Sequence, residues 1–226
     1  MTTPVKGGTV LFSEMTPPKD GEDAFNDWYD NHHMPNHVQG VPGFLSARRY
    51  RSPNGPHYLA IYELGSPEAL EHKEYLKRKL TPDAATKAML EEVSGFTRYI
   101  ANETRVYVRD TPDADSVDAD VVIAVFFMVP PDRGGELMHW HETEHTPMLM
   151  ENQDWLMVRH MEIYDYNPDP YTHLFLHYVR GVSIQDLAAL ATARETQWQH
   201  QLAGENWFVP MAVTYQKRGI PFLKNA

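Results

Sequence analysis

The chain has no cysteine among its 226 residues. Disulfides, thiolate nucleophiles, cysteine-ligated zinc and iron–sulfur clusters are therefore excluded, and any chemistry must use histidine, carboxylate, arginine or tyrosine side chains. The sequence also lacks a run of about 20 apolar residues, the length that a membrane-spanning helix needs. Residues 1–8 contain no hydrophobic signal segment. We therefore expect a cytoplasmic protein with no membrane partner.

An excess of positive charge is missing as well. The sequence carries 20 Lys and Arg residues against 31 Asp and Glu residues, a formal net charge of −11. This charge opposes binding to phosphate backbones, so nucleic acid is not an expected partner. Hydrophobic residues make up 42% of the chain, which is enough for one large or two small packed cores.

A repeated segment divides the sequence into two similar halves. Trp28-Tyr-Asp-Asn-His-His33-Met-Pro35 matches Trp140-His-Glu-Thr-Glu-His145-Thr-Pro147 at Trp, His and Pro, each 112 residues further on. Further matches keep the same order along the chain, which predicts a tandem duplication of one unit. We place the first unit at residues 1–110 and the second unit at residues 118–226, with a polar linker over residues 109–118.

Each unit has the same predicted order of elements, β-α-β-β-α-β. Runs of β-branched and aromatic residues bounded by turn residues predict the strands, which are 9–15, 44–51, 57–63 and 98–108, then 121–129, 155–164, 173–179 and 208–216. Apolar residues at helical spacing predict first helices at 21–33 and 135–145, ended by Pro35 and Pro147, and second helices capped by Ser66 and Ser183. This is the order of the ferredoxin-like unit, so we expect an α+β fold in which two antiparallel sheets close into one barrel.

Short motifs resemble a known superfamily. His33-Met-Pro35 and His145-Thr-Pro147, with Val41-Pro-Gly-Phe44 opening the next strand, resemble the dimeric α+β barrel proteins, in particular EthD-like members with His-x-Pro at the end of the first helix. The resemblance implies heme-dependent enzymes, cofactor-free monooxygenases, polyketide cyclases, muconolactone-type isomerases, or an isomerase and methylesterase pair acting on ring-cleavage products of methoxylated aromatics. A shared fold does not choose among these activities. Fused units and pockets lined by His and Arg resemble the last group most.

The repeated histidines are the first candidates for catalysis. His33 and His145 titrate near neutral pH and lie where a pocket between helix and sheet would open, so either could act as a general acid or base. Tyr29 and its counterpart His141 complete the predicted catalytic set. The alternative is that these histidines only satisfy the last backbone carbonyls of a helix.

Basic residues on the second strands are candidates for substrate binding. Arg48 matches Arg159, and each has a basic neighbour, Arg49 or His160, on the opposite face of its strand. One member of each pair must therefore face inward, where a guanidinium can hold a substrate carboxylate through two parallel hydrogen bonds. The alternative is a surface charge or an internal salt bridge.

Aromatic and metal chemistry leave further alternatives open. Trp28 and Trp140 would give a flat wall for an unsaturated ligand, although tryptophans at this helical spacing are more often part of the core. Heme would need an axial ligand, and His33, His145 or His173 would supply one.

A zinc-protease pattern occurs once. His141-Glu-Thr-Glu-His145 matches His-Glu-x-x-His, and His139 is a possible third ligand. The first unit has no such pattern at the equivalent position, so we expect no metal.

The sequence therefore predicts a cofactor-independent enzyme acting on a small anionic, unsaturated product of aromatic ring cleavage. The expected reaction is isomerisation or methyl-ester hydrolysis, in which His moves a proton and Arg binds a carboxylate. No Gly-x-Ser-x-Gly segment occurs, so water or the substrate itself would have to attack. The alternatives are a heme-binding or oxygen-dependent monooxygenase-like protein and a non-catalytic small-ligand-binding module. A homodimer is a further possibility.

Overall fold

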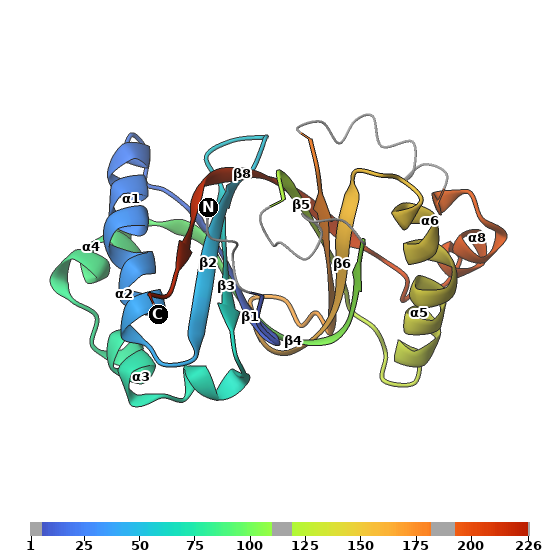
Figure 1. Cartoon of the computed structure of the whole chain (residues 1–226), viewed down its shortest axis with the longest axis horizontal. Coiled ribbons are helices and arrows are strands. Elements are labelled where there is room, and N and C mark those ends of the chain that lie inside the picture. The colour runs from blue at the N-terminus through green and yellow to red at the C-terminus, as the bar shows by residue number, and fades with distance from the viewer. Residues whose placement is uncertain (1–5, 110–118, 182–192, 226) are drawn as a thin grey trace.

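The computed structural model describes residues 6–109, 119–181 and 193–225, and their strands form one closed antiparallel barrel (Figure 1). The strands of the first unit are β1 Thr9–Thr16, β2 Phe44–Arg51, β3 Tyr58–Leu64 and β4 Ser94–Val108. Those of the second unit are β5 Val121–Phe127, β6 Trp155–Asn167, β7 His173–Val179 and β8 Met211–Leu223. The order around the barrel is β1-β3-β2-β8-β5-β7-β6-β4.

This strand order contains two ferredoxin-like sheets. The first unit contributes β4-β1-β3-β2 and the second contributes β8-β5-β7-β6, in the same relative order. Two seams join the sheets, β2 to β8 and β4 to β6. The predicted α+β fold, with ferredoxin-like units closing a barrel within one chain, is confirmed. The unit boundaries stay predictions, and linker residues 110–118 lie outside the described residues.

The helices of each unit cover the outer face of its own sheet, so the two helical layers lie on opposite sides of the barrel (Figure 1). The first unit has α1 Glu22–Trp28, η1 Tyr29–His33, α2 Met34–Gly40, η2 Pro67–Leu70, α3 Lys73–Leu80 and α4 Ala84–Glu92. The second has α5 Gly134–Trp140, η3 His141–His145, α6 Thr146–Met150 and α8 Gln197–Ala203. No described helix combines the length and apolar character needed to cross a membrane.

The prediction that proline ends the first helix of each unit is wrong. Both helices continue through a π-helical segment, and Pro35 and Pro147 lie in the first turn of the helix that follows. The N–H of Met34 bonds the carbonyl of Tyr29, and the N–H of Thr146 bonds that of His141, five residues back in each case. Because proline clashes with the carbonyl four residues before it, the wider π turn lets the helix pass this position. Such π turns are frequent at functional sites.

The second helix of the first unit is broken into pieces. Ser66 makes no capping hydrogen bond, and a short 3-10 turn follows it. The longer helices start further on, where the side chains of His72 and Asp83 accept hydrogen bonds from the backbone of α3 and α4. Pro82 separates these two helices. Ser183, the predicted cap in the second unit, lies outside the described residues.

Alternation along the strands sends side chains to two different cores. Val10, Phe12 and Tyr215 belong to the apolar core inside the barrel. Leu11 and Tyr62 belong instead to a core between the first sheet and its helices. Cavities for a ligand therefore open outside the barrel, between each sheet and its helical layer.

Candidate functional site

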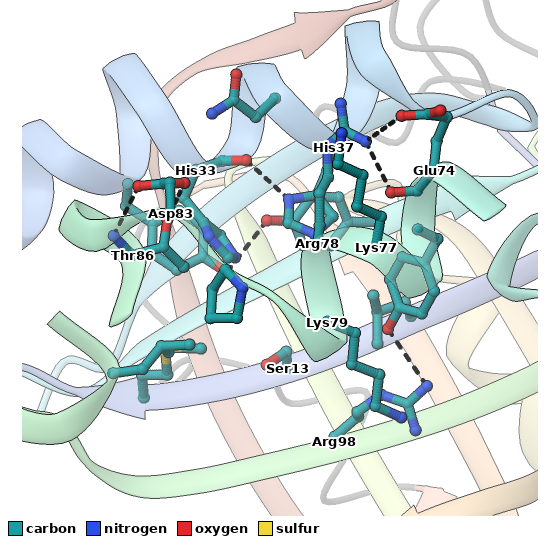
Figure 2. A pocket seen from close by; sticks show the side chains of 18 of the residues that line it. Ser13, His33, His37, Glu74, Lys77, Arg78, Lys79, Asp83, Thr86 and Arg98 are labelled. Atoms are coloured by element: carbon teal, nitrogen blue, oxygen red, sulfur yellow. Dashed lines mark hydrogen bonds and ion pairs between the residues drawn. The ribbon is translucent and has the colours of Figure 1, made fainter. Parts of the chain in front are cut away.

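The first unit holds a cavity of about 410 Å³ between its sheet and its helices. Apolar and aromatic side chains make up much of its wall, and histidine, tyrosine and charged side chains converge on it (Figure 2). The polar, charged and aromatic residues of its wall include Ser13, Tyr29, His33, His37, Tyr62, Glu74, Tyr75, Lys77, Arg78, Lys79, Asp83 and Arg98. We call it the first-unit cavity.

Two histidines lie one helical turn apart on its wall. The rings of His33 and His37 have centroids 4.5 Å apart, and Nδ1 of His37 lies 2.9 Å from the carbonyl oxygen of His33. A carbonyl only accepts, so Nδ1 of His37 carries the proton and Nε2 of the neutral ring has the free lone pair. Burial is the main cause that lowers the pKa of both residues. Each is therefore an imidazole that can accept a proton at neutral pH.

Two phenols stand beside this pair. The hydroxyl of Tyr62 donates to that of Tyr29 at 3.3 Å, and burial raises the pKa of both, so they stay protonated donors. The guanidinium of Arg49 lies 4.3 Å from the ring centre of Tyr29 and pairs with Asp30 at 2.6 Å. Arg49 thus holds the aromatic wall in place from behind the cavity.

Positive charge gathers at the mouth. Lys77 and Lys79 are exposed there, while Arg78 bonds Glu74 at 3.1 Å. Arg98 lies on the opposite side, 2.5 Å from Asp165 and 3.5 Å from the hydroxyl of Tyr75. Figure 2 shows these cationic side chains around the entrance, below and beside the two histidines. Glu74 and Asp83 line the cavity as well, so the exposed Lys77 and Lys79 are the side chains that would favour an anionic ligand here.

The second unit has a smaller cavity of about 300 Å³ at the equivalent place, which we call the second-unit cavity. Trp140, His141, His145 and His177 line it together with apolar side chains. The ring of His145 stacks on Trp140 at 4.5 Å, as that of His33 lies at 4.5 Å from Trp28 in the first unit. The repeated Trp and His therefore have the same packing in both copies.

Four buried histidines gather in the second unit: His141, His145, His160 and His177, here called the histidine cluster. His141 stacks on Phe175 at 4.0 Å and meets His160 edge-on at 4.4 Å, and its Nδ1 lies 2.6 Å from the hydroxyl of Thr146. Burial is the main cause that lowers the pKa of all four, to about 4 for His145 and about 3 for His160.

The predicted arginines lie away from both cavities. Arg48 and Arg159 are buried on the barrel side of their strands, and Arg49 and His160 face the helices. Arg159 bonds Glu63 through both terminal nitrogens, at 2.7 and 3.1 Å, and Glu103 through Nε at 2.7 Å. The carbonyl of Gly7 and the hydroxyl of Tyr178 occupy its other donors. Carboxylate binding by Arg159 stays a prediction that this arrangement does not favour, because it has no donor left.

The zinc-protease pattern is not assembled as a metal site. Glu142 turns outward and pairs with Arg105 of β4 at 2.8 Å. Within residues 6–109, 119–181 and 193–225, no group of three or more His, Asp or Glu side chains is placed to hold a metal ion.

A heme would need a histidine nitrogen with a free lone pair beside a cavity. His37 meets this requirement, since its Nδ1–H is held by a backbone carbonyl, an arrangement that fixes the ring of many metal-ligating histidines. Lys77 and Lys79 would suit the carboxylate side groups of a porphyrin. The donor set of the first-unit cavity therefore fits the group, whereas His173, bonded to Thr172 at 2.9 Å, lines neither cavity.

Some of the site residues predicted from the sequence share a cavity in the structure, and one histidine of the first-unit cavity was not predicted. Tyr29 and His33 share the first-unit cavity, and His141 and His145 share the second. His37 escaped the sequence analysis because the helix was expected to end at Pro35. The spacing of four residues from His33 would have indicated it, had the helix been continued.

Comparisons place the fold among known structures. No family model and no curated protein matches the sequence. The chain is similar to an anthrone oxidase-like protein over 100% of its own length and 97% of the other, with 12% identity and a TM-score of 0.69. It is similar to a chlorite dismutase from Candidatus Nitrospira defluvii over 95% and 93%, with 10% identity and a TM-score of 0.57. A candidate monooxygenase from Fusobacterium nucleatum matches over 97% and 96%, with 11% identity and a TM-score of 0.55.

These likenesses define the class of fold as a dimeric α+β barrel, with both halves in one chain. The EthD-like and methylesterase assignments are not confirmed. At 10–12% identity these neighbours show the fold and do not choose among the activities that the sequence left open.

Proposed function

We propose that this protein is an oxygen-dependent enzyme that oxidises a small, acidic aromatic molecule in the first-unit cavity. The observation that carries the proposal is the orientation of His37, whose Nδ1–H is fixed on the carbonyl of His33 so that Nε2 is the basic atom. The neighbouring anthrone oxidase-like protein and candidate monooxygenase support an oxidative reaction in this fold.

His37 would act as the general base. Its lowered pKa keeps the ring neutral and ready to accept a proton, but also makes it a weak base. The substrate must therefore carry an activated C–H or a phenolic O–H that is itself acidic. Arg98, Lys77 and Lys79 favour the anion that forms when the proton leaves.

The oxidation itself uses dioxygen from solution. The substrate anion gives its electrons to dioxygen, and a methylene group becomes a carbonyl while one molecule of water is formed, so that CH₂ and O₂ yield C=O and H₂O. His37 returns its proton to the departing water. Tyr29, whose hydroxyl accepts a hydrogen bond from Tyr62 and keeps its own O–H, would donate a hydrogen bond to an oxygen atom of the substrate.

Oxygen uptake with a hydroxylated anthrone tests this proposal. We expect uptake and formation of the carbonyl product with the native chain, and a loss of about 100-fold or more in kcat for His37→Gln. The exposed residue His200 in α8 provides a matched control, since His200→Gln should leave the rate unchanged. Absence of uptake, or full activity of His37→Gln, would contradict the proposed function.

Heme binding is the second candidate, favoured by the same free lone pair on His37. A bound heme would supply the oxygen chemistry, and His37 would then hold the iron instead of a proton. Titration with hemin separates the two. A stoichiometric Soret band that His37→Gln abolishes would replace the cofactor-independent proposal.

A further inference from the structure

Polar atoms at the wall of the second-unit cavity have no hydrogen-bond partner within the part of the chain that the structure describes. Trp140 is 2% exposed, and its Nε1 has no hydrogen-bond acceptor among the described residues. The Oε1 atom of Gln199, from α8, is also buried without a donor. Both side chains line the cavity. Because a buried polar atom without a partner destabilises the fold, and native proteins contain few of them, a donor and an acceptor around one cavity indicate a ligand.

The rest of this wall is suited to a flat apolar molecule. Val125, Phe127 and Phe208 line one part of it, and the stacked rings of Trp140 and His145 line another. A cavity of about 300 Å³ lies at the lower end of ligand pockets, which span roughly 300 to 1,000 Å³. It therefore suits a molecule of one or two rings.

The charge of the cavity differs from that of the first-unit cavity. Among its described lining residues Arg194 alone is charged, and that side chain is exposed. His141, His145 and His177 stay neutral because burial lowers their pKa. A carboxylate in this cavity would have only the exposed guanidinium of Arg194 as a charged partner among the described lining residues, and such an exposed pair offsets little of the cost of burying a charge.

We propose that the second-unit cavity is a separate binding site for an uncharged, planar aromatic alcohol. A hydroxyl both donates and accepts, so one such group can bond the indole N–H of Trp140 and the amide oxygen of Gln199. The ring packs between the apolar wall and the indole of Trp140. This site is independent of the function proposed for the first unit.

Binding of 2-naphthol to the full chain, followed by calorimetry and tryptophan fluorescence, tests the site. Gln199→Leu should weaken binding by about tenfold, the effect of one lost hydrogen bond. It should also raise the Tm of the ligand-free chain, since it removes a buried acceptor that has no donor. Gln201→Leu, at an exposed position of the same helix, is the matched control and should change neither quantity.

Three results would overturn the proposal. One is the absence of 2-naphthol binding to the native chain. Another is unchanged binding by both Gln199→Leu and Trp140→Phe. The third is an equal loss of affinity in Gln199→Leu for 2-naphthol and for the anion 2-naphthoate. Both ligands would then use Gln199 in the same way, and the site would not select an uncharged ligand.

Discussion

The two units share a backbone and differ in what they place on it. In both, a helix passes through a π turn, packs a His on a Trp at 4.5 Å, and continues past a proline. The first unit then has a hydrogen-bonded histidine pair beside a cationic mouth, and the second has four buried, neutral histidines and a cavity wall whose one charged member among the described residues is the exposed Arg194. The same backbone thus supports two kinds of pocket, because the backbone fixes only the direction in which each side chain points.

A few paired positions account for much of this difference. In the first unit Arg49 packs under Tyr29 and pairs with Asp30. In the second, His160 stands at the position of Arg49 and contacts His141, and the carboxylate equivalent to Asp30 turns outward to Arg105. Where the second unit has no buried arginine, the equivalent carboxylate is therefore still present but pairs with a different arginine.

The largest expected effect concerns the barrel interior. Arg159→Met should lower the free energy of unfolding by about 3–5 kcal/mol, because Glu63 would be left buried without its cationic partner and Glu103 would keep only Lys6. Arg105→Met removes the exposed pair with Glu142 and should cost about 0–1 kcal/mol. Urea denaturation measures both. Equal losses would mean that the interior pair is not a structural support, and would reopen substrate binding by Arg159.

The second-largest expected effect tests whether the catalytic activity belongs to the first unit alone. The exchange His37→Leu with Leu149→His moves the histidine to the equivalent position of the second unit. Steady-state kinetics should show a loss of about 100-fold in kcat, with no recovery at the new position, since the second-unit cavity lacks the cationic mouth. Recovered activity would mean that a histidine at this position is sufficient and that the surrounding charge is irrelevant.

A smaller effect is expected from acid. Histidines of the histidine cluster have a pKa below the unfolded value of about 6.5, reaching about 4 for His145 and about 3 for His160. The unfolded chain therefore binds more protons, and stability is complete above pH ~6.5 and falls as the pH drops towards these values. The slope is about 1.4 kcal/mol per pH unit for each such histidine. For His160→Phe, denaturation at several pH values between 7 and 4 should show a pH dependence of the unfolding free energy that is smaller by the contribution of one histidine. An unchanged pH dependence would contradict this origin.

The smallest effect concerns the cationic mouth. Lys77→Gln and Lys79→Gln should each raise KM for an acidic substrate by about two- to fivefold, as expected for exposed charges. The change should shrink at high salt, because screening weakens such fields. Binding of 2-naphthol to the second unit should not change. If KM stays constant at low salt, the mouth does not recruit the substrate.

The sequence predicted the fold better than the site. Runs of β-branched and aromatic residues and the repeat at Trp28 and Trp140 were enough to predict the two sheets, because both patterns recur along the chain, and the family resemblance supported their closure. An internal salt bridge was one of the alternatives for Arg159, but its partners could not be predicted, since Glu63 and Glu103 are distant in sequence and approach it only across the closed barrel. His37 was missed for a local reason, the π turn, which has no recognised sequence signal.

The two seams, β2 with β8 and β4 with β6, have a consequence for how such a chain can change over generations. In an assembly of two identical chains, every substitution appears in both halves at once, and a change that improves one pocket must be tolerated by the other. Here a single reading frame encodes both halves of the barrel. Each half can therefore acquire mutations alone, while the seams keep its partner present at a fixed ratio of one to one.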